Sequence, residues 1–190
     1  NAKDYGIPQN RERVFTISIL GGGSYVFPKK MPLALRLKDM LEKEVDEKYY
    51  LTERQVRYVV NEKSSLDDDP RLLGGVDGNA MYGEIYCIDK STNNTRVIDV
   101  ANCITAKEDR GVSIRKAEGT AVVCNNHPWF EAKDLRIRKL TPKECWRLMG
   151  FTDDEFDKAS KVNSKVQLYK QAGNSIVVNV LTEILRNLLG

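Results

Sequence analysis

The segment from Ser175 to Leu188 places the strongest constraint on how this chain folds. Its apolar residues recur at helical spacing, so they form a broad stripe along one side of a predicted helix. The stripe must be buried, and the chain offers no set of predicted strands large enough to cover it. We therefore expect part of the stripe to stay exposed and to promote self-association. Its members are Ile176, Val177, Val180, Leu181, Ile184, Leu185 and Leu188.

The preceding residues carry clear helix-start signals. In Thr141–Glu144, threonine is followed by proline at the first helical position and by glutamate at the third, which predicts a capped helix that ends at Gly150. Thr152 with Glu155, and Ser164 with Gln167, have the spacing of two further capping boxes. The tail of the chain is therefore predicted to be helical.

The middle of the chain reads as a small β-rich unit. Polar loops, which more often carry recognition than packing, separate its short β-like runs. The predicted strands are Glu84–Lys90, Arg96–Thr105, Val112–Lys116 and Gly119–Asn125.

The first third of the chain is predicted to mix a strand with helices. Val14–Leu20 is rich in β-branched residues and predicts a buried strand, and Gly21–Gly23 after it predicts a hinge. Leu33–Glu44 has helical spacing, and Thr52 with Gln55 forms a capping box for another helix.

Composition excludes several classes. The 190 residues suit one domain, or one domain and part of another, and the net charge of +3 does not by itself indicate nucleic acid. Four separated cysteines and one histidine make a zinc site improbable. No apolar run suits a membrane span and no signal peptide is visible, so we expect a cytoplasmic protein with reduced thiols and no metal. Because the chain begins with Asn1, we expect it to be a fragment of a longer protein.

Three stretches together resemble a known family. They are DYGIPQNRERVF (Asp4–Phe15), RKLTPKECWRLMGF (Arg138–Phe151) and QAGNSIVVNVL (Gln171–Leu181). Their order and spacing resemble the last three conserved blocks of the bacterial and phage DNA (cytosine-5) methyltransferases. Pro28 to about Arg136 then fills the place of the family's target-recognition region, and ANCITAKEDRG (Ala101–Gly111) resembles the core of its recognition loop.

The resemblance implies an α/β fold, a partial Rossmann-like methyltransferase domain with an inserted β-rich target-recognition domain. Residues 1–27 would be a strand part of the catalytic domain, 28–151 the recognition domain with a supporting helix, and 152–190 the closing helices. The family's earlier half carries a Gly-rich cofactor loop, a Pro-Cys nucleophile and a Glu-Asn-Val block. No cysteine here follows a proline, so we expect this chain to be inactive without an N-terminal catalytic half.

The family's chemistry assigns expected roles to several residues. A thiolate adds to carbon 6 of a cytosine that has been flipped out of double-stranded DNA, and carbon 5 then takes a methyl group from S-adenosylmethionine. By resemblance, Arg13 contacts O2 of the flipped base and Arg11 orders the site or the backbone. Gly173, Asn174 and Ser175, which we expect to precede the last helix, line the cofactor pocket, with Gly173 allowing close approach to the ligand.

DNA reading is expected from loops. Base edges in the major groove specify sequence, and phosphate contacts set the register. By resemblance, Thr105 approaches the backbone beside the flipped base. The block Arg138–Phe151 is expected to be structural, with Arg138 paired to Glu144 and without a catalytic role for Cys145. The other candidates for DNA contact are Arg96, Asn93, Asn94, Lys107 and Arg110.

Two alternatives remain open. The same residues would suit a non-catalytic DNA-specificity subunit that works with a separately encoded catalytic chain. The short capped helices in Thr141–Gln171 also suggest a helix-turn-helix regulator, but that motif needs a basic recognition helix and Thr152–Asp157 is acidic.

Overall fold

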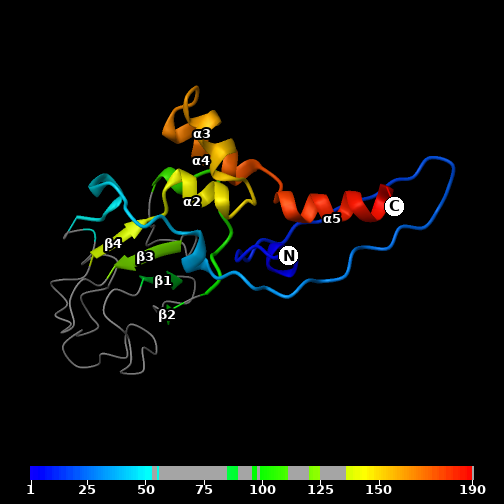
Figure 1. The fold of residues 1–190 in the computed structure, drawn as a ribbon, viewed down its shortest axis with the longest axis horizontal. Helices are drawn as coiled ribbons and strands as arrows, with labels where there is room; N and C mark the ends of the chain where they lie inside the picture. Colours follow the sequence, from blue (N-terminus) through cyan, green and yellow to red (C-terminus); the bar gives the residue numbers. More distant parts are fainter. Residues whose placement is uncertain are drawn as a thin grey trace.

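The structure is a computed structural model that describes residues 1–52, 55, 85–89, 96–97, 99–110, 120–124 and 136–189. An antiparallel sheet and three short helices form one end of the molecule, and the last helix extends away from them (Figure 1). The α-helices are α2 (Pro142–Arg147), α3 (Asp153–Ser160), α4 (Lys165–Asn174) and α5 (Val178–Leu189). Short 3-10 helices are η1 (Ala2–Tyr5), η2 (Leu37–Met40), η3 (Glu47–Tyr49) and η5 (Glu108–Arg110).

The sheet has the strand order β2-β1-β3-β4, with each neighbouring pair antiparallel. Its strands are β1 (Ile85–Asp89), β2 (Arg96–Val97), β3 (Thr120–Cys124) and β4 (Arg136–Lys139). The strands predicted at Glu84–Lys90 and Gly119–Asn125 are confirmed. The strand predicted at Arg96–Thr105 is much shorter, because the chain turns away and Ala101 pairs with Gln9 instead. The run at Val112–Lys116 lies outside the described residues.

The strand predicted at Val14–Leu20 is wrong. No described segment pairs with it, and Val14 and Leu20 are almost fully exposed. Only Phe15 and Ile17 pack against the core, so apolar and β-branched residues here lack the neighbouring strand that a sheet requires. This segment and the residues after it instead form a long extended loop beside α5. Within that loop, Tyr25 donates a hydrogen bond to the carbonyl of Ile184 (Figure 1).

The helix predicted at Leu33–Glu44 is only the single turn η2. The Asp39 side chain accepts a hydrogen bond from the backbone of Arg36 at the start of this turn, and the turn ends because the backbone becomes extended at Leu41. The apolar residues at helical spacing in this segment are nevertheless buried: Leu37, Met40 and Leu41. The Thr52–Gln55 box is present, since Gln55 Oε1 accepts from the Thr52 backbone at 2.9 Å. The helix predicted after it lies outside the described residues.

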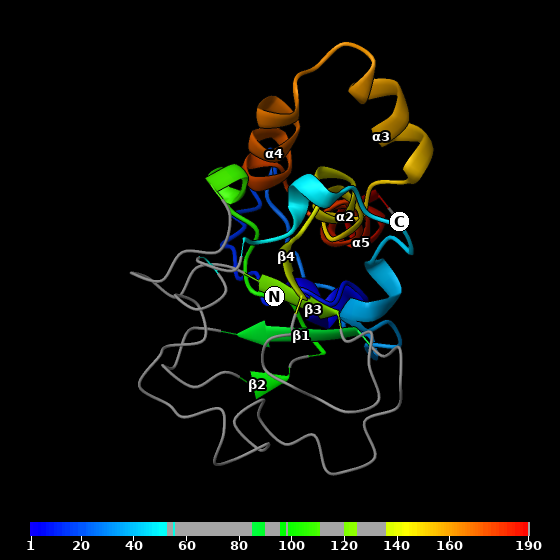
Figure 2. The ribbon, with the colours of Figure 1, turned by 90° about the vertical axis from the view of Figure 1, so that its left-hand side faces the viewer.

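The predicted caps of the tail are confirmed. Thr141 and Thr152 each form a full capping box, with Glu144 and Glu155 respectively, and Ser164 accepts from the backbone of Gln167. Gly150 takes a left-handed conformation just after α2, as a helix-ending glycine should. Figure 2 shows α3 and α4 on the side of α2 that faces away from the sheet.

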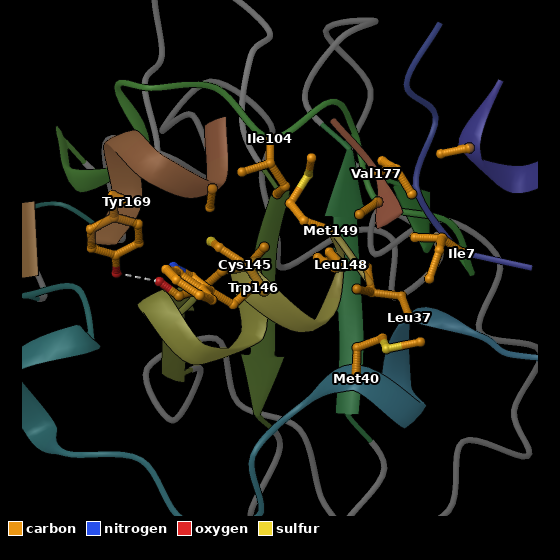
Figure 3. Close-up of a cluster of buried hydrophobic side chains, with 14 of the residues drawn as sticks. Ile7, Leu37, Met40, Ile104, Cys145, Trp146, Leu148, Met149, Tyr169 and Val177 are labelled. Carbon is orange, nitrogen blue, oxygen red and sulfur yellow. Dashed lines mark hydrogen bonds between the residues drawn. The ribbon is translucent and has the colours of Figure 1, made fainter. Parts of the chain in front are cut away.

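The core lies where α2 packs between the sheet, the end of α4 and η2 (Figure 3). Cys145, Leu148 and Met149 have no exposed surface, so α2 and the turn after it present an apolar face to the core. Trp146 donates from its ring nitrogen to the carbonyl of Leu168, which fixes α4 against α2.

The stripe of the last helix is only partly covered. Val177, Val180 and Ile184 are buried against the N-terminal segment. The other members of the stripe expose between 38% and 50% of their surface: Ile176, Leu181, Leu185 and Leu188.

Candidate functional site

Arg11 is the centre of the candidate site because it joins segments that are far apart in the sequence. Its Nη1 donates to the carbonyl of Ile104 at 2.6 Å, and its Nη2 donates to the carbonyls of Gly173 at 2.8 Å and Ser175 at 3.0 Å. The side chain is only 4% exposed. The three sequence stretches around Arg11, Ile104 and Gly173 therefore meet at one buried guanidinium.

The charge on Arg11 is held by neutral groups. Its hydrogen-bond partners are carbonyl oxygens and the thiol of Cys103, and its buried Nε has no hydrogen-bond partner among the described residues. Burial lowers the pKa of the Arg11 guanidinium from its usual range, and the nearby Arg13 charge acts in the same direction. A guanidinium nevertheless stays charged at any ordinary pH.

Arg13 is the exposed member of the pair. Its Nη1 donates to the carbonyl of Glu12 at 2.6 Å, and its Nη2 lies 3.7 Å from the sulfur of Cys103. The same sulfur lies 3.3 Å from Nη1 of Arg11, so Cys103 sits between the two guanidinium groups. One arginine is thus fixed inside the protein and the other is free to meet a ligand.

Gly173 is where α4 touches the turn that begins at Thr105. A methyl group on Gly173 would lie 2.2 Å from the carbonyl carbon of Thr105 and 2.2 Å from the backbone nitrogen of Ala106. Because real side chains never approach backbone this closely, only glycine fits here. The space that a Gly173 side chain would fill is therefore taken by the protein's own backbone, and the expected place of Gly173 in a cofactor pocket stays a prediction.

The same turn holds a buried carboxyl group. Glu108 is 8% exposed, and its Oε2 accepts from the backbone nitrogen of Thr105 at 3.3 Å. Burial raises the pKa of Glu108 to about 7, although the hydrogen bonds from Thr105 oppose that shift. Lys139, at the end of β4, donates a hydrogen bond to the carbonyl of Asp109 at 2.9 Å and so connects the turn to the sheet.

Asn174 and Ser175 end α4; they do not begin the last helix. Asn174 is the final residue of α4 and Ser175 its C-cap, whereas α5 starts at Val178. A helix start offers a ligand free backbone N–H groups, and Asn174 and Ser175 are not at such a start. Asn174 is exposed and its amide has no hydrogen bond within the described part of the chain, whereas the hydroxyl of Ser175 donates to Ala172.

The predicted DNA contacts fall into two groups. Thr105 is half-buried, and Lys107 and Arg110 project from the same turn as exposed side chains, so the structure brings these three together. Arg96 lies in the short strand β2, and its side chain is outside what is described, as are Asn93 and Asn94 entirely.

Gln9 is a site residue that the sequence reasoning missed. Its side chain has no exposed surface, and it donates to the carbonyl of Leu148 at 2.6 Å while accepting from the backbone of Ile104 at 2.9 Å. It holds the Ile104 segment against the end of α2. Only its place two residues before Arg11 could have indicated this role.

Cys145 does not have the properties of a nucleophile. It is fully buried, and burial raises the pKa of its thiol well above the usual range, so the reactive thiolate is absent. Among the described residues, no cluster of side chains suits a metal ion. None of the helices in the described ranges is long and apolar enough to cross a membrane.

Curated relatives match the whole chain. A type II methyltransferase of Lactococcus lactis subsp. cremoris, M2.ScrFI, is 39% identical over 189 residues, which is 99% of this chain and 43% of the relative. The type II methyltransferase M.HhaI of Haemophilus parahaemolyticus is 33% identical and is matched over 51% of its length. The chain thus spans about half the length of the curated relatives it matches.

Solved structures share the fold. The Entamoeba histolytica methyltransferase EhMeth superposes with a TM-score of 0.59 at 19% identity, over 98% of this chain and 50% of that one. A Spodoptera frugiperda DNMT2 mutant gives a TM-score of 0.53 at 18% identity, over 100% of this chain and 56% of that one. The family model described as C-5 cytosine-specific DNA methylase matches residues 1–190. This chain belongs to the C-5 cytosine-specific DNA methylase family.

Proposed function

We propose that this chain is the C-terminal half of a DNA (cytosine-5) methyltransferase and supplies its grip on DNA and one wall of the methyl-donor site. The observation that carries the proposal is the convergence on Arg11. That buried side chain binds the carbonyls of Ile104, Gly173 and Ser175, so the candidate base-pocket, recognition and cofactor segments form one unit.

The proposal divides the chain into three parts. Residues 1–27 and 152–190 belong to the catalytic domain, and residues 28–151 form the target-recognition region with its supporting helix. All strands among the described residues fall between Ile85 and Lys139, inside the second part, which supports this division.

Arg13 is the residue proposed to contact the target base. A flipped cytosine presents O2 as a hydrogen-bond acceptor, and a guanidinium offers several donors in a fixed plane. Arg13 is exposed and lies beside Arg11, whose charge is locked in the protein. Arg11 therefore orders the site, and Arg13 meets the DNA.

The residues present fit S-adenosylmethionine in part. When bound, this cofactor supplies the methyl group. The exposed amide of Asn174 has both donors and an acceptor to offer a polar ligand, whereas Gly173 packs on Thr105 and the carbonyls of Gly173 and Ser175 are used by Arg11. Asn174 is therefore the residue proposed to hold the cofactor, with Ser175 fixing the backbone beside it.

The reaction also needs a nucleophilic thiolate, which we propose is supplied by the N-terminal half. Cys145 is buried as a thiol, and none of the four cysteines follows a proline. A non-catalytic specificity subunit acting with a separate catalytic chain would use the same residues. Co-purification with such a chain would favour that alternative.

Duplex binding and methyl transfer test the proposal. The purified chain is expected to bind a cytosine-containing duplex, with affinity that falls as salt rises. It is also expected to incorporate no methyl group from tritiated S-adenosylmethionine. Co-expression with the first half of the Lactococcus relative should restore incorporation, and Arg13→Ala should abolish it. Failure to bind any duplex at low salt, or methyl transfer by the chain alone, would overturn the proposal.

A further inference from the structure

The turn from Thr105 to Arg110 presents three of the proposed DNA contacts, yet few hydrogen bonds between its own backbone groups hold it in place. Its internal backbone bonds are those from Glu108 to Thr105 at 3.2 Å and from Arg110 to Lys107 at 3.0 Å. Outside the turn, Lys139 binds the carbonyl of Asp109, and Gly173 packs against the Thr105 backbone. The remaining support comes from a side chain inside the turn.

That side chain is Glu108. Its carboxyl points back to the start of the turn, where Oε2 lies 3.3 Å from the backbone nitrogen and 3.5 Å from the hydroxyl of Thr105. The same hydroxyl accepts from the backbone nitrogen of Lys107 at 3.3 Å. The carboxyl is buried, whereas Lys107 and Arg110 point to solvent, so Glu108 faces the protein and the cations face outward.

A buried acid beneath a DNA-binding turn is unfavourable unless it has a structural task. Burial of a carboxylate costs free energy, and a negative charge beside phosphates weakens DNA binding. Glutamine or a small residue would avoid both costs. The hydrogen bonds to Thr105 are the compensating gain visible in the structure.

We propose that Glu108 is a positioning residue for DNA binding: its carboxyl fixes Thr105 and thereby the directions in which Lys107 and Arg110 leave the turn. This inference rests on the proposed function, because it assigns the turn to the DNA interface. Glu108 itself does not touch DNA.

Asp109 provides a matched control for the test. It is the next residue, it carries the same charge, and it holds the turn through its backbone carbonyl while its side chain has no hydrogen bond within the described residues. At pH 8, above the pKa of about 7 of Glu108, removing either carboxylate takes one negative charge from the interface, and that change alone should strengthen DNA binding. Only the loss of Glu108 removes the hydrogen bonds to Thr105.

The experiment measures duplex affinity by fluorescence anisotropy for the full chain at pH 8 and fixed salt. Glu108→Ala is expected to bind roughly tenfold more weakly, because two hydrogen bonds that order the turn are lost. Asp109→Ala is expected to bind as tightly as the unaltered chain or more tightly. Glu108→Gln, which keeps an acceptor for the Thr105 backbone, should restore affinity to within roughly threefold.

Glu108→Asp covers the case in which Glu108→Ala does not fold. It keeps the charge but withdraws the oxygens from Thr105, so it is expected to bind several-fold more weakly. Circular dichroism at the assay temperature identifies the folded variants. The inference is overturned if folded Glu108→Ala, or Glu108→Asp in its place, binds like Asp109→Ala. It is equally overturned if Glu108→Gln binds no better than Glu108→Ala. Absence of duplex binding by the unaltered chain would overturn both this inference and the proposed function.

Discussion

Arg138 and Glu144 form a two-point ion pair that is closed to solvent. Both Nη groups of Arg138 lie 2.8 Å from the carboxylate oxygens of Glu144, and the two side chains expose 2% and 0% of their surface. Glu144 also accepts from the backbone nitrogens of Glu42 at 2.9 Å and Thr141 at 2.8 Å. One carboxylate thus joins β4, the start of α2 and the segment after η2.

Removal of one partner of this pair is predicted to be costly. Glu144→Gln should lower the free energy of unfolding by about 3 kcal/mol, because it removes the charge of one member of a buried ion pair. Urea unfolding followed by circular dichroism measures this. The exposed pair of Arg147 and Asp153 is the control, and Asp153→Asn should cost no more than about 1 kcal/mol. Equal losses in the two variants would contradict the argument.

Arg11 and Arg13 are predicted to separate stability from binding. Arg11→Met removes the bonds to three buried carbonyls and should lower the free energy of unfolding by about 3 kcal/mol. Arg13→Met should change it by no more than about 0.5 kcal/mol, since that side chain is exposed. Thermal unfolding and duplex binding are compared for both variants. The division of roles fails if Arg13→Met unfolds as easily as Arg11→Met.

Gly173→Ala is predicted to destabilise, against the usual trend. Alanine in place of glycine inside a helix ordinarily stabilises by about 1 kcal/mol. Here the added methyl group would collide with the backbone of Thr105 and Ala106, so a loss of about 2 kcal/mol or more is expected from denaturant unfolding. Asn174→Ala at the next, exposed position should be nearly neutral. A more stable Gly173→Ala variant would show that the two backbones do not touch.

The stability of the chain is predicted to fall between pH 5 and pH 8 because of Glu108. Its pKa of about 7 in the folded protein exceeds the ordinary value of 4.5, so the folded state binds the proton more tightly. Its contribution is complete below pH 4.5 and is lost as the pH rises through 7, and the change between pH 5 and pH 8 is roughly 2.5 kcal/mol. Asp109 raises the pKa further, whereas Lys139 lowers it.

Urea unfolding at pH 5 and pH 8 tests this titration. Glu108→Gln should remove most of the difference between the two pH values, and Asp109→Asn should keep it. The buried Cys145 faces Glu108 as well, and burial already raises the pKa of its thiol, so it stays neutral across this range. An unchanged pH dependence in Glu108→Gln would assign it to another group.

The exposed part of the α5 stripe is predicted to drive self-association. Leu185→Ser should reduce the mass seen by light scattering without loss of thermal stability, because that side chain is 42% exposed. Ile184→Ser, at a position only 3% exposed, should instead destabilise the fold. A strictly monomeric unaltered chain would contradict the prediction.

Local sequence signals predicted the structural features that depend only on residues close together in the chain, such as the helix caps. Thr141 and Glu144 are three residues apart, and the box they form depends only on that spacing. The pairing of Glu144 with Arg138 was also expected from their shared block. Val14–Leu20 failed because a strand needs a neighbour, and the β propensity of these residues gives no information about one.

The sequence suggested residues for the candidate site but not the contacts between them. Arg11 was expected to order the site, and in the structure it bonds to the carbonyls of Ile104 and Gly173. The sequence did not show that Gly173 meets Thr105, because that contact joins residues far apart in the chain. Glu108 likewise resembled an ordinary loop acid, since burial is a property of the folded arrangement alone.

Under the proposed function, the contact between Gly173 and Thr105 limits how the recognition segment can be exchanged for another. A transplanted segment must supply backbone that packs on the end of α4 without a gap or an overlap. Exchanges of sequence that retain residues 99–110 preserve this contact. Exchanges that cut through these residues must redesign both this turn and the end of α4. Under the proposed function, the boundary of an exchangeable recognition segment is therefore set by where the backbone of Thr105 and Ala106 meets the end of α4.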